Sequence, residues 1–392
     1  MSKQVVGINP KVLEWARIRS GQSIDDVAAA FGKDPEIIQS WESGEAAPTY
    51  VQLEKLAYTV YKRPIALFFF PTIPKETDPE HSFRTLPETE IEELGADTRH
   101  KVREARAMQL SLAELTEKNP SPKQILKDIA AKSSDSAAAI AAKVREYLGI
   151  GLNTQKSWKN TEDALKAWRS AVEDVGVFVF KDSFKQKDIF GFSLYDPEFA
   201  VILINNSTAQ TRQLFTLFHE LAHLIVHESG VTKKDDSYIE SLHGQAKQIE
   251  VFCNKSAAEL LIPTQDFKST LKSYQKHDEQ AVADIAWTYK ASREVVLRRM
   301  LDMGLVNKQR YEHDVKKWAE EYEAKLIADA QGGKSGGNYY ATQASYLGEK
   351  YMNLAFSSYY RGKISVEQLA DYLNVSVKNV PGLEQFVLQK TS

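Results

Sequence analysis

The stretch TRQLFTLFHELAHLIVH, residues 211–227, decides the fold of this chain and most of its chemistry. It is apolar on nearly every side of a helix, so we expect a buried helix. His219 and His223 project within about 40° of each other on one face of that helix. Each buried imidazole needs a partner, because an unpaired polar group in a dry core costs on the order of 1–3 kcal/mol. One metal ion would satisfy both rings.

The residue between the two histidines adds a chemical role. The pattern His-Glu-x-x-His on a helix is typical of zinc sites in which the glutamate acts as the base. Glu220 lies about 100° around the helix from His219, so it can approach the open position of the ion without binding it. We therefore predict that Glu220 is the catalytic residue, which assists the attack of a water that the metal activates.

A second predicted helix, residues 244–261, supplies the third ligand. Glu250 follows His223 at a distance that lets a separate helix carry it to the same ion. Asn254, one turn further on, is placed to hydrogen-bond a ligand and fix its orientation. Two histidines and one carboxylate leave a fourth position free, which is the arrangement of a catalytic zinc site. Zn²⁺ is therefore the predicted cofactor.

Several other residues are further candidates for the site. His227 comes one helical turn after His223, and we expect it to pack or to hydrogen-bond a ligand from the second layer. Tyr238 and His243 fall between the two zinc helices, where a donor to a transition-state oxyanion would sit. Cys253 is expected to be a small buried apolar residue. Glu259 points roughly opposite to Glu250 and is rejected as a ligand.

The first part of the chain resembles the helix-turn-helix domain of the XRE, or lambda-repressor-like, class. The matching residues run from Ser23 to Gly44, with Trp41-Glu42-Ser43-Gly44 at the end and Pro48 beyond. The resemblance places four residues at a DNA contact: Lys33, Gln39, Ser40 and Ser43. Gln39 suits adenine, but residues 1–75 hold nine basic and eight acidic residues, which is a poor surface for phosphate. A DNA-binding role and a protein-docking or dimerisation role both stay open.

The zinc helices resemble the ImmA/IrrE family of zinc metallopeptidases. The resemblance rests on residues 204–205, on residues 212–224, and on the block from Glu250 through Asn254 to residues 257–263. It implies that His219, His223 and Glu250 bind zinc. It also implies a site-specific endopeptidase whose substrate is a protein regulator, a repressor or antitoxin-like partner, in control of transcription or of a stress or mobile-element response. The alternative is a DNA-binding regulator or antitoxin that keeps the metallopeptidase fold without turnover.

The predicted fold class is α+β and predominantly helical. We expect an all-α helix-turn-helix domain over residues 1–75, a linker over 76–110 and a helical plus zincin-like metallopeptidase domain over 111–330. A flexible linker at 331–337 and a small helical C-terminal domain at 338–392 follow. A small three-stranded sheet is predicted from the apolar runs at 175–180, 189–195 and 199–204.

The composition and net charge limit the compartment and the partners that we expect for the protein. No apolar stretch reaches 18 residues, so no membrane partner is expected. The N-terminus lacks the apolar core of a signal peptide, and a single cysteine excludes an intramolecular disulfide, so we expect a cytoplasmic protein. The net charge of −3 excludes a globally basic surface, so any DNA contact is local. A homodimer is a further arrangement that the sequence leaves open.

Overall fold

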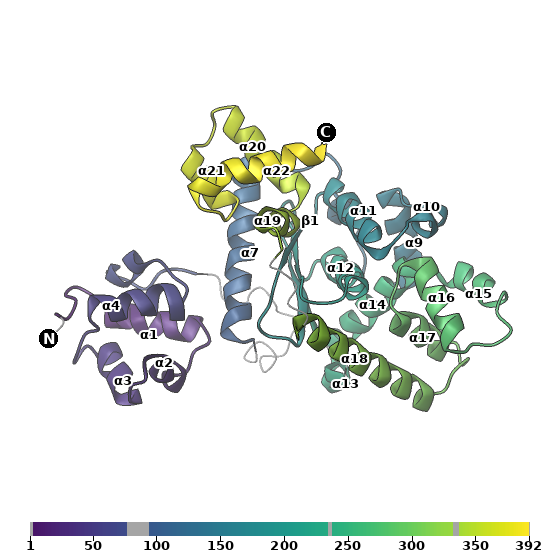
Figure 1. Cartoon of the computed structure of the whole chain (residues 1–392), viewed down its shortest axis with the longest axis horizontal. Helices are drawn as coiled ribbons and strands as arrows, with labels where there is room; N and C mark the ends of the chain where they lie inside the picture. Colours follow the sequence, from purple (N-terminus) through teal and green to yellow (C-terminus); the bar gives the residue numbers. More distant parts are fainter. Residues whose placement is uncertain (1–2, 77–93, 234–236, 332–336, 392) are drawn as a thin grey trace. The chain divides into compact units, whose positions relative to one another are not determined.

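The computed structural model describes residues 3–76, 94–233, 237–331 and 337–391. They form two compact units, Met1–Arg106 and Ala107–Ser392, which we describe separately (Figure 1). Most elements are helices, and one small mixed sheet lies in the second unit, so the predicted α+β, predominantly helical class is confirmed. Within the described residues, every helix is too short or too polar to cross a membrane.

The first unit is a helical bundle around a small apolar core. Ser23 caps the second helix through a reciprocal pair of bonds with Asp26, and Gly32 ends it in the left-handed conformation. Three residues separate that helix from the next, and the partly buried ion pair between Arg17 and Glu42, 2.8 Å long, joins the first helix to the third. The elements are α1 (Pro10–Arg19), α2 (Ile24–Phe31), α3 (Pro35–Ser43), α4 (Tyr50–Glu54), the π-helix η1 (Lys55–Val60) and the 3₁₀ helix η2 (Ile65–Phe69).

Helix α7 (Ala96–Leu115) occupies much of the segment that we predicted to be a linker. Residues 77–93 of the predicted linker lie outside the described residues, but from Ala96 the chain is helical. Val102, Ala105 and Leu112 are buried, and this spacing gives the helix an apolar stripe that a linker would lack. Gln109 is also buried and donates to the backbone oxygen of Leu194.

The sheet has four strands in the order β1-β3-β2-β4, not the three that we predicted. They are β1 (Phe178–Asp182), β2 (Ile189–Leu194), β3 (Val201–Asn205) and β4 (Val231–Lys233). Strands β1 and β3 are parallel, and β2 is antiparallel to both β3 and β4. The prediction missed β4 because it is three residues long and Val231 is its only apolar residue. The first strand begins at Phe178, because Val175 and Gly176 end the preceding helix, and Gly176 has a φ of 93°.

Strands β2 and β3 are buried along their whole length, which explains why they appear as continuous apolar runs in the sequence. Helix α12 (Gln210–Ile225) packs on one face of the sheet, against β2, β3 and β4 (Figure 1). Helices α14 (Gly244–Leu261) and α11 (Thr161–Asp174) pack against α12 in turn. This arrangement buries α12 between a sheet and two helices.

The remaining helices complete the second unit around this core. They are α8 (Ile125–Asp128), α9 (Ala137–Leu148), α10 (Leu152–Ser157), α13 (Ser237–Ser241), α15 (Thr264–Leu271), α16 (Glu279–Tyr289), α17 (Arg293–Asp302), α18 (Lys308–Gln331), α19 (Tyr339–Leu347), α20 (Glu349–Tyr360), α21 (Val366–Tyr372), the 3₁₀ helix η3 (Val377–Asn379) and α22 (Val380–Thr391). Helix α19 contacts β1, so the segment predicted as a separate C-terminal domain belongs to the same compact unit as the sheet. The predicted linker at 331–337 lies mostly outside the described residues.

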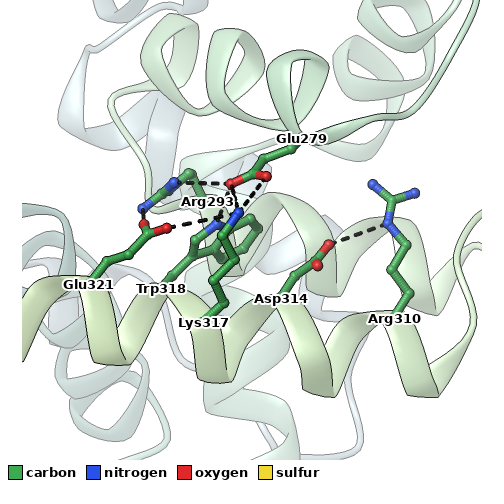
Figure 2. Close-up of polar contacts among 7 residues, drawn as sticks. All are labelled: Glu279, Arg293, Arg310, Asp314, Lys317, Trp318 and Glu321. Carbon is green, nitrogen blue, oxygen red and sulfur yellow. Dashed lines mark hydrogen bonds and ion pairs between the residues drawn. The ribbon is translucent and has the colours of Figure 1, made fainter.

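A polar network fastens the long charged helix α18 to α16 and α17 (Figure 2). Glu279 at the start of α16 accepts hydrogen bonds from Lys317 and from the indole nitrogen of Trp318. Arg293 of α17 pairs with Glu279 and with Glu321. The charged groups are largely exposed, so each pair contributes little by itself. Trp318 is buried, and its packing anchors the helix.

Candidate metal centre

Helix α12 carries the two histidines in its most buried part. Residues 216–225 are all buried, and the side chains of His219 and His223 are 2% and 0% exposed. Their neighbours Phe218 and Leu221 belong to the main apolar core. The two imidazoles are therefore held one turn apart on a helix that is fixed by packing on several sides.

Helix α14 brings the third residue to them. It packs against α12, and the small side chains of Cys253 and Ala257, both 0% exposed, belong to the main apolar core. Glu250 is 2% exposed and faces both rings, with its Oε2 3.4 Å from His219 Nε2 and its Oε1 3.3 Å from His223 Nε2. The structure thus brings together the three residues that we predicted to be ligands.

The electrostatics of the cluster favour an ionised carboxylate. Burial by itself raises the pKa of the Glu250 carboxyl, but the His223 and His219 rings, by charge and by hydrogen bonding, hold that pKa far below its ordinary value. A charged carboxylate and two ring nitrogens that face one another form a set of ligand atoms for a cation.

Asn254 sets the proton on one of the rings. Its Oδ1 lies 2.9 Å from His219 Nδ1. An amide oxygen only accepts, so His219 Nδ1 carries the proton and donates it. In the neutral, metal-binding form of the ring, the lone pair of His219 is then on Nε2, the atom that faces His223 and Glu250. The Nδ1 of His223 has no hydrogen-bond partner among the described residues.

The spacing of the ligand atoms fits a tetrahedral ion. The two Nε2 atoms are 3.0 Å apart, and each is 3.3–3.4 Å from a Glu250 oxygen. Ligands at about 2.0–2.1 Å from a tetrahedral zinc ion would be about 3.3 Å from one another. Two nitrogens and one oxygen also match the donors that zinc takes in catalytic sites. The residues present therefore fit a four-coordinate divalent ion with one position left for another ligand.

Glu220 lies beside this cluster but is not one of its ligand residues. It is fully buried, and both of its carboxylate oxygens accept hydrogen bonds from the sheet. Ser193 Oγ of β2 donates to Oε2 over 2.7 Å, and Thr232 Oγ1 of β4 donates to Oε1 over 2.6 Å. The carboxylate is thus held on the side of α12 that faces β2 and β4.

Two of the weaker candidates lie away from the ligands. Of the two roles predicted for His227, packing or a hydrogen bond to a ligand, the structure shows packing, because α12 ends at Ile225 and His227 turns out of the helix with a φ of 62°. Its ring contacts the backbone oxygen of Leu126 and packs beside Tyr195. Glu259 pairs with Arg299, which agrees with its rejection as a ligand.

Within the described part of the chain, neither predicted oxyanion donor is placed at the cluster. His243 is an exposed residue at the N-terminus of α14, whereas the ligands are buried. Tyr238 lies in α13, but its side chain is outside the described part of the chain. Cys253 is fully buried, and burial together with the Glu250 and Glu220 carboxylates raises the pKa of its thiol, so it stays a neutral apolar residue.

The residues predicted to contact DNA lie on and just before α3. Lys33, Gln39 and Ser43 are exposed, and Ser40 is half-buried. The hydroxyl of Ser40 donates to the backbone oxygen of Ile37, and that of Ser43 donates to Ser40, so both hydroxyls are engaged within the helix. Of the four, Lys33 and Gln39 are the side chains that face solvent without such a bond.

Sequence reasoning missed three residues around Glu220. Ser193 interrupts an otherwise apolar run at residues 189–195, and a lone buried hydroxyl in such a run was a usable signal. Thr232 and Gly230 lie in and before the short strand β4, which no pattern in the sequence identifies. A Cβ on Gly230 would lie 2.3 Å from the ring of His223, so the chain passes directly against that ring.

Comparison with known proteins agrees with this geometry. Residues 172–301 match the peptidase family described as the IrrE N-terminal-like domain. The matched region contains α12 and α14, and hence all three candidate ligand residues and Glu220. The second unit therefore contains an IrrE-like metalloprotease domain with a candidate metal site at His219, His223 and Glu250. The match does not include the N-terminal unit, whose helix-turn-helix role stays a prediction.

The chain is also similar to two curated proteins, each named radiation response metalloprotease IrrE. The protein from Deinococcus deserti is 39% identical over 77 residues, which is 18% of this chain and 25% of the relative. The protein from Deinococcus radiodurans is 39% identical over 75 residues, which is 18% of this chain and 21% of the relative. The chain thus spans about a quarter of the length of the curated relatives it matches.

Proposed function

We propose that this protein is a zinc-dependent endopeptidase that cleaves a protein regulator, a repressor or antitoxin-like partner. The observation that carries the proposal is the convergence of His219, His223 and Glu250 beside the buried carboxylate of Glu220. Two buried histidines and a carboxylate leave an open position on a tetrahedral ion, which distinguishes a catalytic zinc site from a closed structural one. The name of the curated relatives, metalloproteases, supports the same reaction class.

Each residue has a definable part in peptide hydrolysis. When bound, zinc supplies Lewis acidity, which activates the attacking water and polarises the peptide carbonyl. His219 and His223 offer neutral nitrogens and Glu250 a negative oxygen, so the three side chains together carry one negative charge to the ion. Glu220 takes a proton from the water while the oxygen of that water bonds to the peptide carbon. The same carboxyl then gives that proton to the departing amine as the carbon–nitrogen bond breaks.

The buried environment suits this proton transfer. Ser193 and Thr232 donate to Glu220 and have no charge of their own, so the carboxylate remains the only ionisable group in that trio. The main core surrounds α12 and limits the water that reaches the ligands. Cleavage of such a regulator would control transcription, a stress response or the response of a mobile element.

The metal part of the proposal is tested by elemental analysis. Purified protein should bind about one zinc per chain. His219→Ala and Glu250→Ala should lose it, whereas Glu220→Gln should keep it. Full zinc occupancy in both ligand variants would rule out this centre.

The activity is tested with a library of internally quenched peptides. The zinc-loaded protein should cleave members of the library, a chelator should stop it, and Glu220→Gln should lower the rate by at least about 100-fold. Cleavage that survives in Glu220→Gln would mean that another residue, or another protein, is the protease.

A second candidate function is a DNA-binding regulator or antitoxin that keeps the domain without turnover. Lys33, just before α3, and Gln39 on α3 are exposed, which favours this function. Glu36 on α3 is also exposed, and its negative charge would repel the DNA phosphates. A gel-shift series against salt concentration separates the two functions, because a DNA reader loses affinity steeply as salt rises. Under this alternative, Gln39→Ala and Ser40→Ala abolish the regulatory effect of the protein in cells, and Glu220→Gln leaves that effect intact.

A further inference from the structure

The side chain of Glu220 is bound at both oxygens by hydroxyl groups from two neighbouring strands. Ser193 and Thr232 donate to it over 2.7 Å and 2.6 Å. The relative exposures of Ser193, Thr232 and Glu220 are 0%, 6% and 0%, so water does not compete for these bonds. The two hydroxyls lie on the antiparallel pair β2 and β4, where Gly191 is opposite Thr232.

The direction of each hydrogen bond is fixed by chemistry. An ionised carboxylate accepts only, so both hydroxyl protons point at Glu220. Ser193 Oγ has a lone pair left, and the backbone nitrogen of Gly230 donates to it over 3.1 Å. The backbone nitrogen of Ser193 donates in turn to the Gly230 oxygen over 2.9 Å. Ser193 is therefore locked to the chain that leads into β4, and its hydroxyl has one orientation.

The same segment also touches a metal ligand. Gly230 lies so close to the ring of His223 that a methyl group there would overlap it. Two residues later, Thr232 holds Glu220. One short segment of backbone therefore fixes the base and one ligand relative to each other, and the geometry between them depends on β4 as much as on α12.

We propose that Ser193 and Thr232 are positioning residues that set the place of the Glu220 carboxylate beside the metal centre. This inference rests on the proposed function, in which Glu220 is the base. A glutamate side chain has three rotatable bonds, and proton transfer needs the carboxylate within hydrogen-bond reach of the attacking water. Two hydroxyls that bind the two oxygens separately restrict both the position and the plane of the carboxylate.

A purely structural role for these hydroxyls predicts something different. In that case they would only compensate a buried charge, and any substitution that keeps the fold would keep the turnover rate. The positioning role requires the hydroxyl itself, whatever the effect on stability. Thr232 allows a matched comparison, because valine keeps its shape without the hydroxyl and serine keeps the hydroxyl without the methyl group.

The experiment measures kcat, KM and zinc content for Thr232→Val, Thr232→Ser and Ser193→Ala on the best-cleaved peptide of the quenched library. We expect kcat of Thr232→Val and Ser193→Ala to fall about 10- to 100-fold, because a misplaced catalytic group costs that much. We expect KM to stay within about twofold, because substrate binding does not use these hydroxyls. Thr232→Ser should keep kcat within about threefold, and all three should bind zinc as the unmodified protein does.

Thr216 provides the control. It is a fully buried threonine on α12, about one turn before Glu220, and its hydroxyl has no hydrogen-bond partner among the described residues. Thr216→Val removes a buried hydroxyl from the same helix without removing a hydrogen bond to Glu220. Its kcat should match that of the unmodified protein. An equal loss in Thr216→Val and Thr232→Val would show a general packing effect and overturn the proposal.

A second measurement keeps the test independent of turnover. Crystal structures of metal-free Ser193→Ala and Thr232→Val protein should show the Glu220 carboxylate displaced from its place in the unmodified protein. An unmoved carboxylate, or unchanged kcat in Thr232→Val, overturns the positioning role while leaving the peptidase proposal intact. If the unmodified protein cleaves no peptide, the proposed function fails by itself, and the crystal structures still decide whether these hydroxyls position Glu220.

Discussion

His219 donates a hydrogen bond from its Nδ1 to Asn254 Oδ1 over 2.9 Å, across the contact between α12 and α14. This bond gives one ring a defined tautomer and turns its Nε2 toward His223 and Glu250. His223 has no such bond from its Nδ1 among the described residues. The two histidines are therefore oriented by different means, one by a hydrogen bond and the other by packing.

We predict that Asn254→Ala weakens zinc binding by about 10- to 100-fold, because the His219 ring loses the partner that fixes its tautomer. Competition with a chromophoric chelator measures the affinity. Asn254→Asp keeps an acceptor at that position and should lose less affinity than Asn254→Ala. Equal affinities of Asn254→Ala and the unmodified protein would mean that helix packing alone orients the ring.

Gly230 lies against the ring of His223, as Asn254 lies against the ring of His219. We predict that Gly230→Ala lowers zinc affinity and also lowers the free energy of unfolding by about 1–3 kcal/mol, because the new methyl group overlaps the buried His223 ring. Zinc affinity and urea unfolding of the same protein measure the two effects.

Gly151 is the matched control for this change. No atom lies within 4 Å of a Cβ built there, and its φ of −74° suits any residue. Gly151→Ala should leave zinc affinity unchanged. A normal zinc affinity in Gly230→Ala would show that the His223 ring can move aside without losing the ion.

The ligand residues could be predicted from the sequence because their arrangement is local. His219 and His223 are related by one helical turn, and Asn254 by one turn to Glu250, so the helical period alone places each pair. The helix predicted at about 244–261 coincides with α14. The burial that made a metal site plausible follows from the apolar residues around the pattern.

The parts that failed depend on where the chain leaves its regular structure. The prediction for His227 assumed one more turn of helix, but the chain turns at Val226 and His227 adopts a positive φ. The contacts of Glu220 come from β2 and β4, and pairing between strands that are about 40 residues apart has no signature in the sequence of either. Where α19 meets β1, Arg169 donates hydrogen bonds to the backbone of both elements, and the sequence pattern around Arg169 does not reveal these long-range contacts.

Arg169 of α11 joins the C-terminal helices to the core. Its guanidinium pairs with Glu173 over 2.9 Å and donates to the backbone oxygens of Ser345, Tyr346 and Val179. We predict that Arg169→Met lowers the free energy of unfolding by about 3–5 kcal/mol, because it leaves the buried Glu173 carboxylate without its ion-pair partner. Urea unfolding followed by circular dichroism measures this loss.

Lys308 serves as the control for Arg169. It pairs with Glu312 on α18, and both side chains are largely exposed. Lys308→Met should change the free energy of unfolding by less than about 0.5 kcal/mol. A comparable small effect of Arg169→Met would show that the C-terminal helices are held by their apolar contacts instead.

Lys181 of β1 should make stability depend on pH in the alkaline range. Burial, together with the smaller effect of the Arg169 charge, lowers the pKa of its amine to about 8, against the opposing carboxylates of Glu162 and Glu173. An unfolded lysine has a pKa of about 10.4. Between these values the unfolded chain binds more protons than the folded one, so stability rises with pH. Below pH 8 both states are charged and the penalty of burying the charge is fully present.

We therefore predict that the free energy of unfolding rises by up to about 3 kcal/mol between pH 8 and pH 10.4 through this one group. Lys181→Met has no amine to titrate, so the variant should be more stable than the unmodified protein at pH 7, and the difference should shrink as pH approaches 10. Tyrosines that titrate near the upper end affect both proteins equally and cancel in the difference. Parallel urea titrations at pH 7, 8, 9 and 10 give that difference directly. A constant difference across the series would show that Lys181 stays charged in the folded protein, with its amine reaching water from the end of β1.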